Sequence, residues 1–469
     1  MTSKRWTLVV VCAATAMLML DIAVVNTALS RIAEDLDTGL SGLQWVVDAY
    51  TLALAAVVLT AGSLADRFGR RRLFTIGLAV FTAASGACAA ATDILFLDVA
   101  RAVQGVGAAV MFAVSLALLA QAFPGARERA GALAAYGATI GGTFAVGPLV
   151  GGALTSAMDW QWIFLINIPI GIACLWITRV SVSESRDPRA PRVDWLGQTA
   201  LSAGLFLLVL GLLRGNEEGW TSTPIVAELA GAAALVVAFL VIEARVAEPM
   251  LPLRLFRNPS FTGAQIAATA ISATFFASFL YMTLYMQHVL GLSAVETGLA
   301  YLPATIVIFF VSGATHTLTE RVSPRVMIAG GLGLVAVGMA LFTMADAGSS
   351  WTAMLPGELV AGVGCGLFNP ALTAVALGSA PIEQSGLAAG VNDTFRQAGI
   401  AVGVAALGAL IPAEAALGGG SAVEYVNGLH DALWVGVGVA AVGAVAAGAL
   451  IRSGARTPRV VAELVPAPA

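Results

Sequence analysis

Long apolar segments, separated by short polar ones, run along almost the whole chain. Each is close to the ~20 residues that an α-helix needs to cross about 30 Å of hydrocarbon. They fall at residues 7–28, 44–65, 73–92, 95–121, 132–155, 162–180, 194–213, 223–243, 260–286, 298–316, 325–345, 351–378, 386–411 and 429–451. This pattern predicts an all-α integral membrane protein with 14 transmembrane helices, an even number that places both termini on one side of the membrane.

The distribution of positive charge supports this helix count. Short loops rich in Lys and Arg are retained on the cytoplasmic side of a membrane. Most of the 24 Lys and Arg residues lie in the two tails and in the alternate loops that share their side, whereas only Arg31 and Arg214 lie in loops on the opposite side. A missed helix would reverse the alternation downstream of the error, so we expect both termini in the cytoplasm.

Composition excludes several classes of protein. The chain of 469 residues is 58% hydrophobic and only 11% charged, whereas soluble domains carry about 25% charged residues. The net charge of −4 is too small to indicate a nucleic-acid partner. Neither a metal site nor a disulfide framework is expected, because the cysteines and histidines have no neighbours at metal-ligand spacing. They are Cys12, Cys88, Cys174, Cys365, His288, His316 and His430.

A basic loop lies between the second and third apolar segments. It reads Gly62-Ser-Leu-Ala-Asp66-Arg67-Phe-Gly69-Arg70-Arg-Arg and resembles the signature between helices 2 and 3 of the major facilitator superfamily of transporters. Gly62 and Gly69 permit close approach and a tight turn. Asp66 is expected to accept backbone N–H groups at a neighbouring helix start, and Arg67 and Arg70 to pair with carboxylates across the lobes. The resemblance implies a latch that stabilises the state closed to the cytoplasm.

An internal repeat predicts a body of two lobes. The segment from Val311 to Arg325 repeats the basic loop in a degraded form, and Leu355–Gly364 resembles Leu97–Gly107. Parallel repeats around a midplane site are found in secondary transporters, so we divide the helices into six, an inserted pair and six. The predicted units are an amino-terminal lobe at 1–180, cytoplasmic linkers with inserted helices 7 and 8 at 181–258, a carboxy-terminal lobe at 259–451 and a cytoplasmic tail at 452–469.

Motifs in helices 1, 4 and 5 narrow the resemblance to one family. The residues are Leu20-Asp21-Ile-Ala-Val-Val-Asn26-Thr-Ala-Leu29 in helix 1, Arg101-x-x-Gln104-Gly105-x-Gly107 in helix 4, and Gly147-Pro148-x-x-Gly151-Gly152 in helix 5. Together they resemble the motifs of the fourteen-helix drug:proton antiporters. Helix 1 departs from that pattern at Ala23, where Thr is usual, and at Ser30, where Pro is usual.

The resemblance covers essentially the whole chain and implies a function. It implies a secondary active exporter that exchanges protons for lipophilic small molecules, such as drugs, antibiotics or dyes, by alternating access in a bacterial-type cell membrane. It also implies a monomer of two pseudo-symmetric lobes that needs no cofactor beyond the proton gradient. Ala134 and Thr143 stand where the helix-5 motif usually has Gly. This departure leaves a proton-coupled importer on the same fold as an alternative.

Ionised side chains within a span are costly, so they usually face the bundle interior and have a partner. Asp21, Asp48 and Arg101 lie at similar depths in helices 1, 2 and 4. We expect Arg101 to pair with Asp21, or with Asp48, in a contact that proton binding breaks, because an opposite charge favours the ionised carboxylate while burial favours the neutral acid. A static structural ion pair is the alternative. Asp48 is the weaker candidate, because it is expected near the membrane interface, where a carboxylate is solvated.

The second lobe carries its own charged candidates. Asp393 and Arg396 stand three positions apart on helix 13, where they are expected to neutralise each other. Arg396 and Asn392 are then candidates for cavity contacts. Glu358 occupies the position that the repeat aligns with Arg101, so it is either a second proton site or a group that recognises a cation.

We expect a substrate cavity between the lobes. Its candidate residues are polar or aromatic groups within the spans: Asn26, Gln104, Tyr281, Tyr285, Asn392, Asp393 and Arg396. Core packing is the alternative role for each aromatic side chain. The small residues of helix 5 allow close helix contact, and Pro148 is expected to bend that helix.

The sequence argues against two further classes of protein. A polytopic membrane enzyme needs a large polar catalytic loop or a metal cluster, a membrane sensor needs an additional soluble domain, and the sequence indicates neither. The sequence also has no Gly-x-x-x-x-Gly-Lys-[Ser/Thr] motif for a nucleotide. We therefore predict a transporter that is not an enzyme, with the lipid bilayer, protons and a lipophilic small molecule as its partners.

Overall fold

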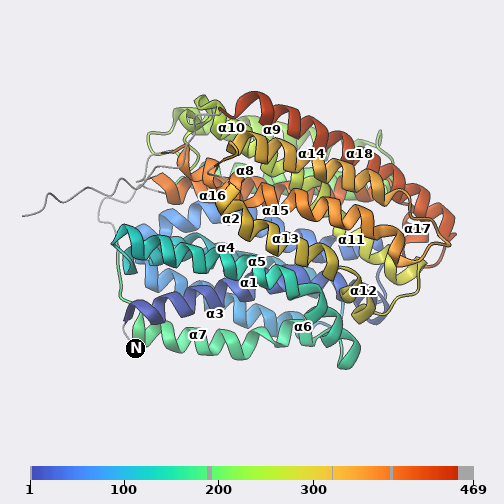
Figure 1. The fold of residues 1–469 in the computed structure, drawn as a ribbon, viewed down its shortest axis with the longest axis horizontal. Coiled ribbons are helices and arrows are strands. Elements are labelled where there is room, and N and C mark those ends of the chain that lie inside the picture. The colour runs from blue at the N-terminus through green and yellow to red at the C-terminus, as the bar shows by residue number, and fades with distance from the viewer. Residues whose placement is uncertain (1–2, 187–192, 319–320, 381–383, 453–469) are drawn as a thin grey trace, which may run out of the picture.

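The computed structural model describes residues 3–186, 193–318, 321–380 and 384–452. Over these ranges every regular element is helical, and the long helices run roughly parallel in an elongated bundle (Figure 1). The expected all-α architecture is therefore confirmed. The expected cytoplasmic tail lies, apart from Arg452, outside the described residues, as does the 187–192 part of the linker.

The first half of the chain builds one lobe of the bundle. Gly69, with a φ of 111°, separates the second helix from the third, because a left-handed residue cannot continue either helix. Asp93 caps the fourth helix by accepting the N–H of Phe96 at 2.9 Å. The helices are α1 (Ser3–Asp35), α2 (Leu40–Phe68), α3 (Arg70–Ala89), α4 (Ile94–Ala122), α5 (Ala126–Ala157), α6 (Trp162–Leu165) and α7 (Asn167–Ser181).

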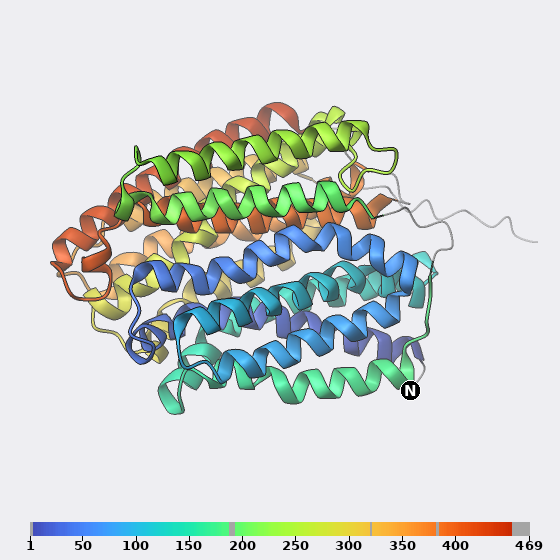
Figure 2. The ribbon, with the colours of Figure 1, turned by 180° about the vertical axis from the view of Figure 1, so that it is seen from behind.

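An inserted pair of helices follows, α8 (Trp195–Glu218) and α9 (Thr223–Arg245). Asp194 caps α8 by accepting the N–H of Gly197 at 2.8 Å. Helix α8 packs against α9 on one side and against α2 and α16 on the other. Figure 2 shows the two green helices side by side along the outside of the bundle. The inserted pair thus contacts the rest of the bundle mainly through α8.

The second half of the chain builds the other lobe. One of its spans, Pro259–Val289, is interrupted by two π-helical turns, a feature that is frequent at functional sites. The elements are η1 (Leu253–Arg257), α10 (Pro259–Ile271), η2 (Ser272–Phe276), α11 (Ala277–Leu284), η3 (Tyr285–Val289), α12 (Ala294–Ala300), α13 (Leu302–Leu318), α14 (Pro324–Phe342), η4 (Trp351–Met354), α15 (Leu355–Gly378), α16 (Ser385–Gly408), α17 (Ala413–Ala416) and α18 (Ala422–Leu450).

The described helices account for the 14 expected spans. Thirteen segments are long and apolar enough to cross a membrane. The remaining expected span corresponds to α16, which has 24 residues, packs against α2, α8 and α10, and carries the polar cluster around Asp393 in its middle. Both ends of the bundle core, Ser3 and Leu450, lie at the same end of the molecule, which we call the terminal end; the opposite end is the distal end. Which end faces the cytoplasm stays a prediction.

Both lobes use the same close contact between small residues. In the first lobe, a Cβ atom on Gly107 of α4 would lie 2.6 Å from the backbone nitrogen of Phe81 on α3. In the second lobe, a Cβ atom on Gly364 of α15 would lie 2.5 Å from the Gly331 carbonyl oxygen on α14. Gly107 and Gly364 occupy equivalent positions in the sequence repeat, so the pseudo-symmetry extends to backbone contacts that only glycine permits.

The two lobes are closed against each other at the distal end. Gly152 and Pro148 of α5 contact Ala294 and Gly298 of α12 so closely that a Cβ atom on either glycine would overlap the opposite backbone carbonyl. Gln287 also donates to the Thr27 carbonyl oxygen at 3.0 Å. Toward the terminal end, an added Cβ atom on Gly131, Gly137 or Gly141 of α5, or on Gly313 of α13, would meet nothing within 4 Å. Helix α5 therefore packs tightly against the second lobe only in its distal half.

Candidate functional site

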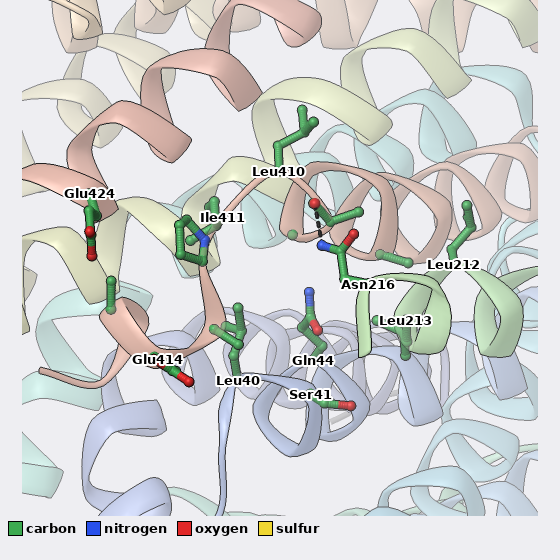
Figure 3. Close-up of a pocket in the computed structure, with 16 residues that line it drawn as sticks. Leu40, Ser41, Gln44, Leu212, Leu213, Asn216, Leu410, Ile411, Glu414 and Glu424 are labelled. Atoms are coloured by element: carbon green, nitrogen blue, oxygen red, sulfur yellow. Dashed lines mark hydrogen bonds between the residues drawn. The ribbon is translucent and has the colours of Figure 1, made fainter. Parts of the chain in front are cut away.

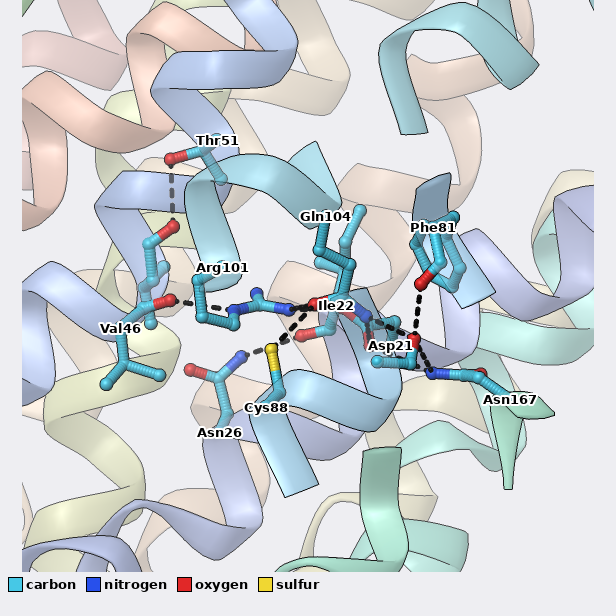
Figure 4. A network of polar contacts seen from close by, with 12 residues as sticks. Asp21, Ile22, Asn26, Val46, Thr51, Phe81, Cys88, Arg101, Gln104 and Asn167 are labelled. Carbon is cyan, nitrogen blue, oxygen red and sulfur yellow. Dashed lines mark hydrogen bonds and ion pairs between the residues drawn. The ribbon is translucent and has the colours of Figure 1, made fainter. Parts of the chain in front are cut away.

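A buried ion pair lies in the core of the first lobe (Figure 4). Nη1 of Arg101 on α4 lies 2.5 Å from Oδ2 of Asp21 on α1. The side chain of Asp21 is fully buried and that of Arg101 is 2% exposed. Of the two expected partners, the structure thus brings Asp21 and not Asp48 to the guanidinium.

Amide side chains complete the coordination of the Asp21 carboxylate. Its Oδ1 accepts from Nε2 of Gln104 at 2.8 Å and from Nδ2 of Asn167 at 3.1 Å. Gln104 also donates to Ser85 at 2.9 Å and accepts from Nη1 of Arg101 at 2.6 Å. Gln104 was expected in the cavity, but the structure uses it to bind Asp21. Asn167 and Ser85 are partners that were not predicted from the sequence; for Asn167 the available signal was a lone amide within the sixth apolar segment.

The guanidinium of Arg101 is held on its other faces as well. Its Nε donates to the Val46 carbonyl oxygen at 3.0 Å, and its centre lies 4.3 Å from the centroid of the Tyr50 ring. A buried pair of this kind makes only a modest net contribution to stability, but removing one partner leaves an unpaired buried charge that costs about 3–5 kcal/mol. The charge on Asp21 therefore has to be neutralised by Arg101 or by a proton.

A central cavity of about 50 Å³ lies beside this pair, between the lobes. Asn26, Tyr50 and Arg101 line it from the first lobe, and Phe276 and Phe279 line it from the second. Pockets that bind drug-sized ligands have volumes of about 300–1,000 Å³. The lobes must therefore separate before a molecule of that size fits between them.

An aromatic cluster forms the second-lobe wall of the cavity. Phe144 of α5 meets the rings of Phe276 and Phe279 edge-on, at centroid distances of 5.6 and 6.1 Å. Arg396 lies over Phe276 at 5.7 Å. Asp393 and Arg396 are not joined by an ion pair within 4.0 Å, and Oδ2 of Asp393 has no hydrogen-bond partner. That these two residues neutralise each other over a longer distance stays a prediction.

The other expected cavity residues lie outside the central cavity. Nδ2 of Asn392 donates to Oε1 of Gln265 at 3.1 Å, which is a contact within the second lobe. The hydroxyl of Tyr285 donates to the Asp346 carbonyl oxygen at 2.8 Å, and that of Tyr281 to the Val404 carbonyl oxygen. Of the expected residues other than Arg101, only Asn26 lines the cavity in the described part of the chain.

Two further carboxylates are buried without a partner. The expectation that Asp48 is solvated was wrong: its side chain is fully buried, and neither carboxylate oxygen has a hydrogen-bond partner. The physical reason is that α2 begins at Leu40, about two turns before Asp48, so that neighbouring helices cover this position. Glu358 on α15 is only 3% exposed, and both of its carboxylate oxygens are likewise unpartnered.

The basic loop is anchored within its own lobe. Asp66 pairs with Arg70 one turn later at 2.8 Å, so it does not cap α3 as expected. Glu184, which sequence analysis missed, performs that role: its carboxylate accepts the N–H groups of Arg71 at 2.9 Å and Arg72 at 3.1 Å. Arg67 is exposed and lies over the Phe68 ring. The expected contacts of Arg67 and Arg70 across the lobes are therefore not found in this conformation, because Arg70 is already paired at i,i+4.

Gln44, Tyr281 and Val404 form a cluster that joins the lobes near the distal end. Nε2 of Gln44 on α2 donates to the Tyr281 hydroxyl at 2.8 Å, and that hydroxyl donates to the Val404 carbonyl oxygen on α16. Both side chains lie against Gly408, where a Cβ atom would overlap Gln44 and Tyr281. A second cavity of about 470 Å³ opens beside Gln44, between α2, α8 and the end of α16 (Figure 3). Gln44 lines the distal cavity and Val404 lines the central cavity, so this cluster lies between the two cavities.

Comparison with known proteins decides the family. The model of the family described as Major Facilitator Superfamily matches residues 11–404. The chain belongs to the major facilitator superfamily. It is 36% identical over 400 residues to the multidrug resistance protein Stp of Mycobacterium tuberculosis, covering 85% of this chain and 74% of that protein.

Other similarities agree with this family. The chain is 36% identical over 450 residues to the cephamycin export protein CmcT of Amycolatopsis lactamdurans, covering 93% of this chain and 91% of that protein. The crystal structure of the peptide transporter POT matches with a TM-score of 0.67 at 14% identity, covering 95% of each chain, which supports the fold. This major facilitator protein is thus a multi-pass protein of the plasma membrane.

In this major facilitator protein, the glycine motif of α5 is an inter-helix contact surface. A Cβ atom on Gly151 would lie 2.7 Å from the Cα atom of Val24, and one on Gly147 would overlap the side chain of Ala23. The departure from the usual Thr at position 23 thus falls where α1 meets α5, five residues or fewer from Asp21 and Asn26. Helix α5 fixes α1, which carries the buried carboxylate, and at Gly152 it also contacts the second lobe.

The Gln44–Tyr281–Val404 cluster predicts that Gly408→Ala opens the distal end. The added methyl group overlaps both side chains, so their hydrogen bond cannot form. Spin labels at Asp159 and Glu414, in a background without native cysteines, should report a larger fraction of long distances than in the parent protein. Gly438→Ala is the matched control, because a Cβ atom there meets nothing within 4 Å. An unchanged distance distribution in a folded Gly408→Ala protein would show that the cluster does not hold the lobes together.

The loop geometry predicts that Glu184→Ala destabilises the first lobe. The substitution removes the acceptor for the first N–H groups of α3, which should cost about 1 kcal/mol. The thermal unfolding midpoint of the purified protein should fall accordingly. Glu414→Ala, which removes an exposed carboxylate at the distal end, should leave the midpoint nearly unchanged. Equal midpoints for the two variants would argue against the capping role.

Proposed function

We propose that this protein exports lipophilic small molecules across the plasma membrane in exchange for protons. The observation that carries the proposal is the buried Asp21–Arg101 pair, which is 2.5 Å long and lies beside a cavity between two lobes. The printed names of its relatives, a multidrug resistance protein and a cephamycin export protein, support export. We further propose that it works as a monomer, without a cofactor, and that it catalyses no reaction on its substrate.

Proton exchange follows from the alternatives open to the Asp21 carboxylate. When Asp21 is ionised, Arg101 and the amides of Gln104 and Asn167 hold its charge. When Oδ2 binds a proton, the ion pair is lost, and the positive charge of Arg101 at the cavity wall is left unpaired. The two states differ in the charge that the cavity presents, so proton binding and substrate binding are coupled. Such coupling is what an antiporter requires.

Asp48 and Glu358 are proposed as additional proton sites, one in each lobe. Each is buried with both carboxylate oxygens unpartnered, and an ionised group in that setting is strongly disfavoured. Asp48 lies one helical turn from Gln44, the residue beside the distal cavity, so a proton arriving there has a short path to Asp48. Glu358 lines neither the central nor the distal cavity and is the more distant candidate.

Alternating access is proposed to proceed by separation of the lobes at either end. The lobes are taken as residues 1–180 and 259–451, with the inserted helices and linkers between them. The tight distal contacts of α5 with α12 support a state closed at the distal end. With cytoplasmic termini, as the positive charges indicate, this state would be closed to the outside. Opening the distal end then requires the Gln44–Tyr281 contact to break.

Loss of the Asp21 carboxylate should abolish proton-driven export. Asp21→Asn keeps the shape but can neither ionise nor exchange a proton. In proteoliposomes with an imposed pH gradient, the wild type should move ethidium against its concentration gradient, and Asp21→Asn should show at least about a tenfold lower initial rate. Glu34→Gln, which removes an exposed carboxylate from the same helix, is the matched control.

Either of two outcomes would count against this proposal. Gradient-dependent transport that persists in Asp21→Asn would remove Asp21 as the coupling group. Transport by the wild type that does not respond to the pH gradient would remove proton coupling altogether. An Asp21→Asn protein that still exchanges substrate across the membrane without a gradient would separate lost coupling from lost folding.

A further inference from the structure

Two buried carboxylates outside the central site face each other on the inserted helices. Asp194 precedes α8, and Glu243 lies in the last turn of α9. Asp194 is 9% exposed and Glu243 is 3% exposed. Both lie at the terminal end of the bundle, where the inserted pair joins the rest of the chain, and neither contributes to the contacts around Asp21.

Each carboxylate has one oxygen occupied and one without a partner. Oδ1 of Asp194 accepts the N–H of Gly197 at 2.8 Å, and Oε2 of Glu243 accepts the N–H of Leu251 at 3.1 Å. Oδ2 of Asp194 and Oε1 of Glu243 have no hydrogen-bond donor. Both oxygens lie beside Gly197, because a Cβ atom there would lie 2.5 Å from Oδ2 and 3.1 Å from Oε1.

In the part of the chain that the structure describes, no positively charged side chain pairs with these two carboxylates within 4.0 Å. The charged residues at the end of α9 and after it, namely Arg245, Glu248, Arg254 and Arg257, are exposed. On the side of α2, the groups that meet α8 here are Thr60 and the Ala56 carbonyl, which hydrogen-bond to Gln198 one turn after Asp194. The charged residues of α16, Asp393 and Arg396, lie farther along the bundle, beside the central cavity.

The unfilled position between the oxygens suits a proton better than a metal ion. Two ionised carboxylates in a buried setting repel each other and lose their hydration, so such pairs characteristically retain a proton. Within the described ranges, no group of at least three His, Cys, Asp or Glu side chains is placed to hold a metal. A metal ion would need several ligands, whereas a proton needs only the two oxygens.

We propose that Asp194 and Glu243 form a proton-binding site, in which one proton on Oε1 of Glu243 is donated to Oδ2 of Asp194. The resulting hydrogen bond ties the start of α8 to the end of α9. Each of the two linked helices is also bonded to one lobe. Gln198 of α8 donates to the Ala56 carbonyl oxygen of α2 at 2.9 Å, and Glu243 of α9 accepts the N–H of Leu251 in the segment leading to α10. This site does not depend on the proposed export function.

The functional consequence is a pH-sensitive link between the lobes. Loss of the proton leaves two facing negative charges, which repel each other and loosen the end of the inserted pair. In its protonated state, the folded protein holds a proton that the same side chains of the unfolded chain release at neutral pH. This site therefore contributes stability at low pH that is lost as the pH rises. Buried Met250, Leu251 and Leu255 transmit that loosening to α10, because they pack in the same core cluster as Phe261.

Thermal unfolding as a function of pH tests the site. Between about pH 6 and about pH 9, the unfolding midpoint of the wild type should fall as the pH rises. The unfolding midpoint of Glu243→Gln should fall less steeply with pH, because the amide of the new side chain donates to Oδ2 of Asp194 at every pH. Asp194→Asn should behave likewise, since its amide donates to Oε1 of Glu243 and its oxygen still caps α8. Glu414→Gln, an exposed carboxylate at the distal end, should keep the slope of the wild type.

The same preparation distinguishes the other outcomes. Equal slopes for the wild type and both amide variants would overturn the proposal. A wild-type midpoint that rises on adding sodium or magnesium chloride at alkaline pH, with no rise in Glu243→Gln, would identify a cation in place of the proton. Infrared difference spectra between low and high pH give a readout that needs no unfolding: a protonated-carboxyl band lost in the wild type should be missing from Asp194→Asn, and its persistence there would contradict the assignment.

Discussion

A carboxylate placed where water cannot reach it is the constraint on which the first lobe depends. Asp21 is fully buried, and an isolated charge there would be prohibitively costly. The lobe offsets that cost with partners from three other helices. Arg101 of α4 and Asn167 of α7 contact Asp21 on α1 directly, and Ser85 of α3 is connected to it through Gln104. Such convergence requires the helices to approach closely, which explains why glycines lie at the α3–α4 and α1–α5 contacts.

The two lobes share this packing but carry different charges. Gly107 and Gly364 make equivalent contacts, yet Arg101 in the first lobe corresponds to an unpartnered Glu358 in the second. The duplicated scaffold is thus independent of the charges placed on it. The asymmetry puts an ion pair on one side of the cavity and, on the other, an aromatic wall that includes Phe276, over which Arg396 lies.

Sequence patterns were sufficient for the architecture and for part of the site. Hydropathy identified the spans because the thickness of the hydrocarbon core sets the length of each apolar segment. Asp21 and Arg101 stood out because charges within spans are rare. The contacts of Glu184, Asn167 and Gln44 were not predictable, since each depends on a residue far away in the chain. Asp48 was misplaced for a related reason: its burial depends on where α2 begins and on what packs over it. The position of Asp194 and Glu243 on either side of Gly197 likewise depends on the packing of α8 against α9.

Proton release on ligand binding tests the central claim most directly. Purified protein in weakly buffered detergent solution is mixed with ethidium, and the pH change is followed with an indicator at several starting pH values. If Asp21 exchanges its proton when substrate binds, the wild type should release up to about one proton per bound molecule in a pH-dependent manner. Asp21→Asn should bind ethidium without that release. Binding by the wild type with no proton release at any pH, or equal release by both proteins, would contradict the account.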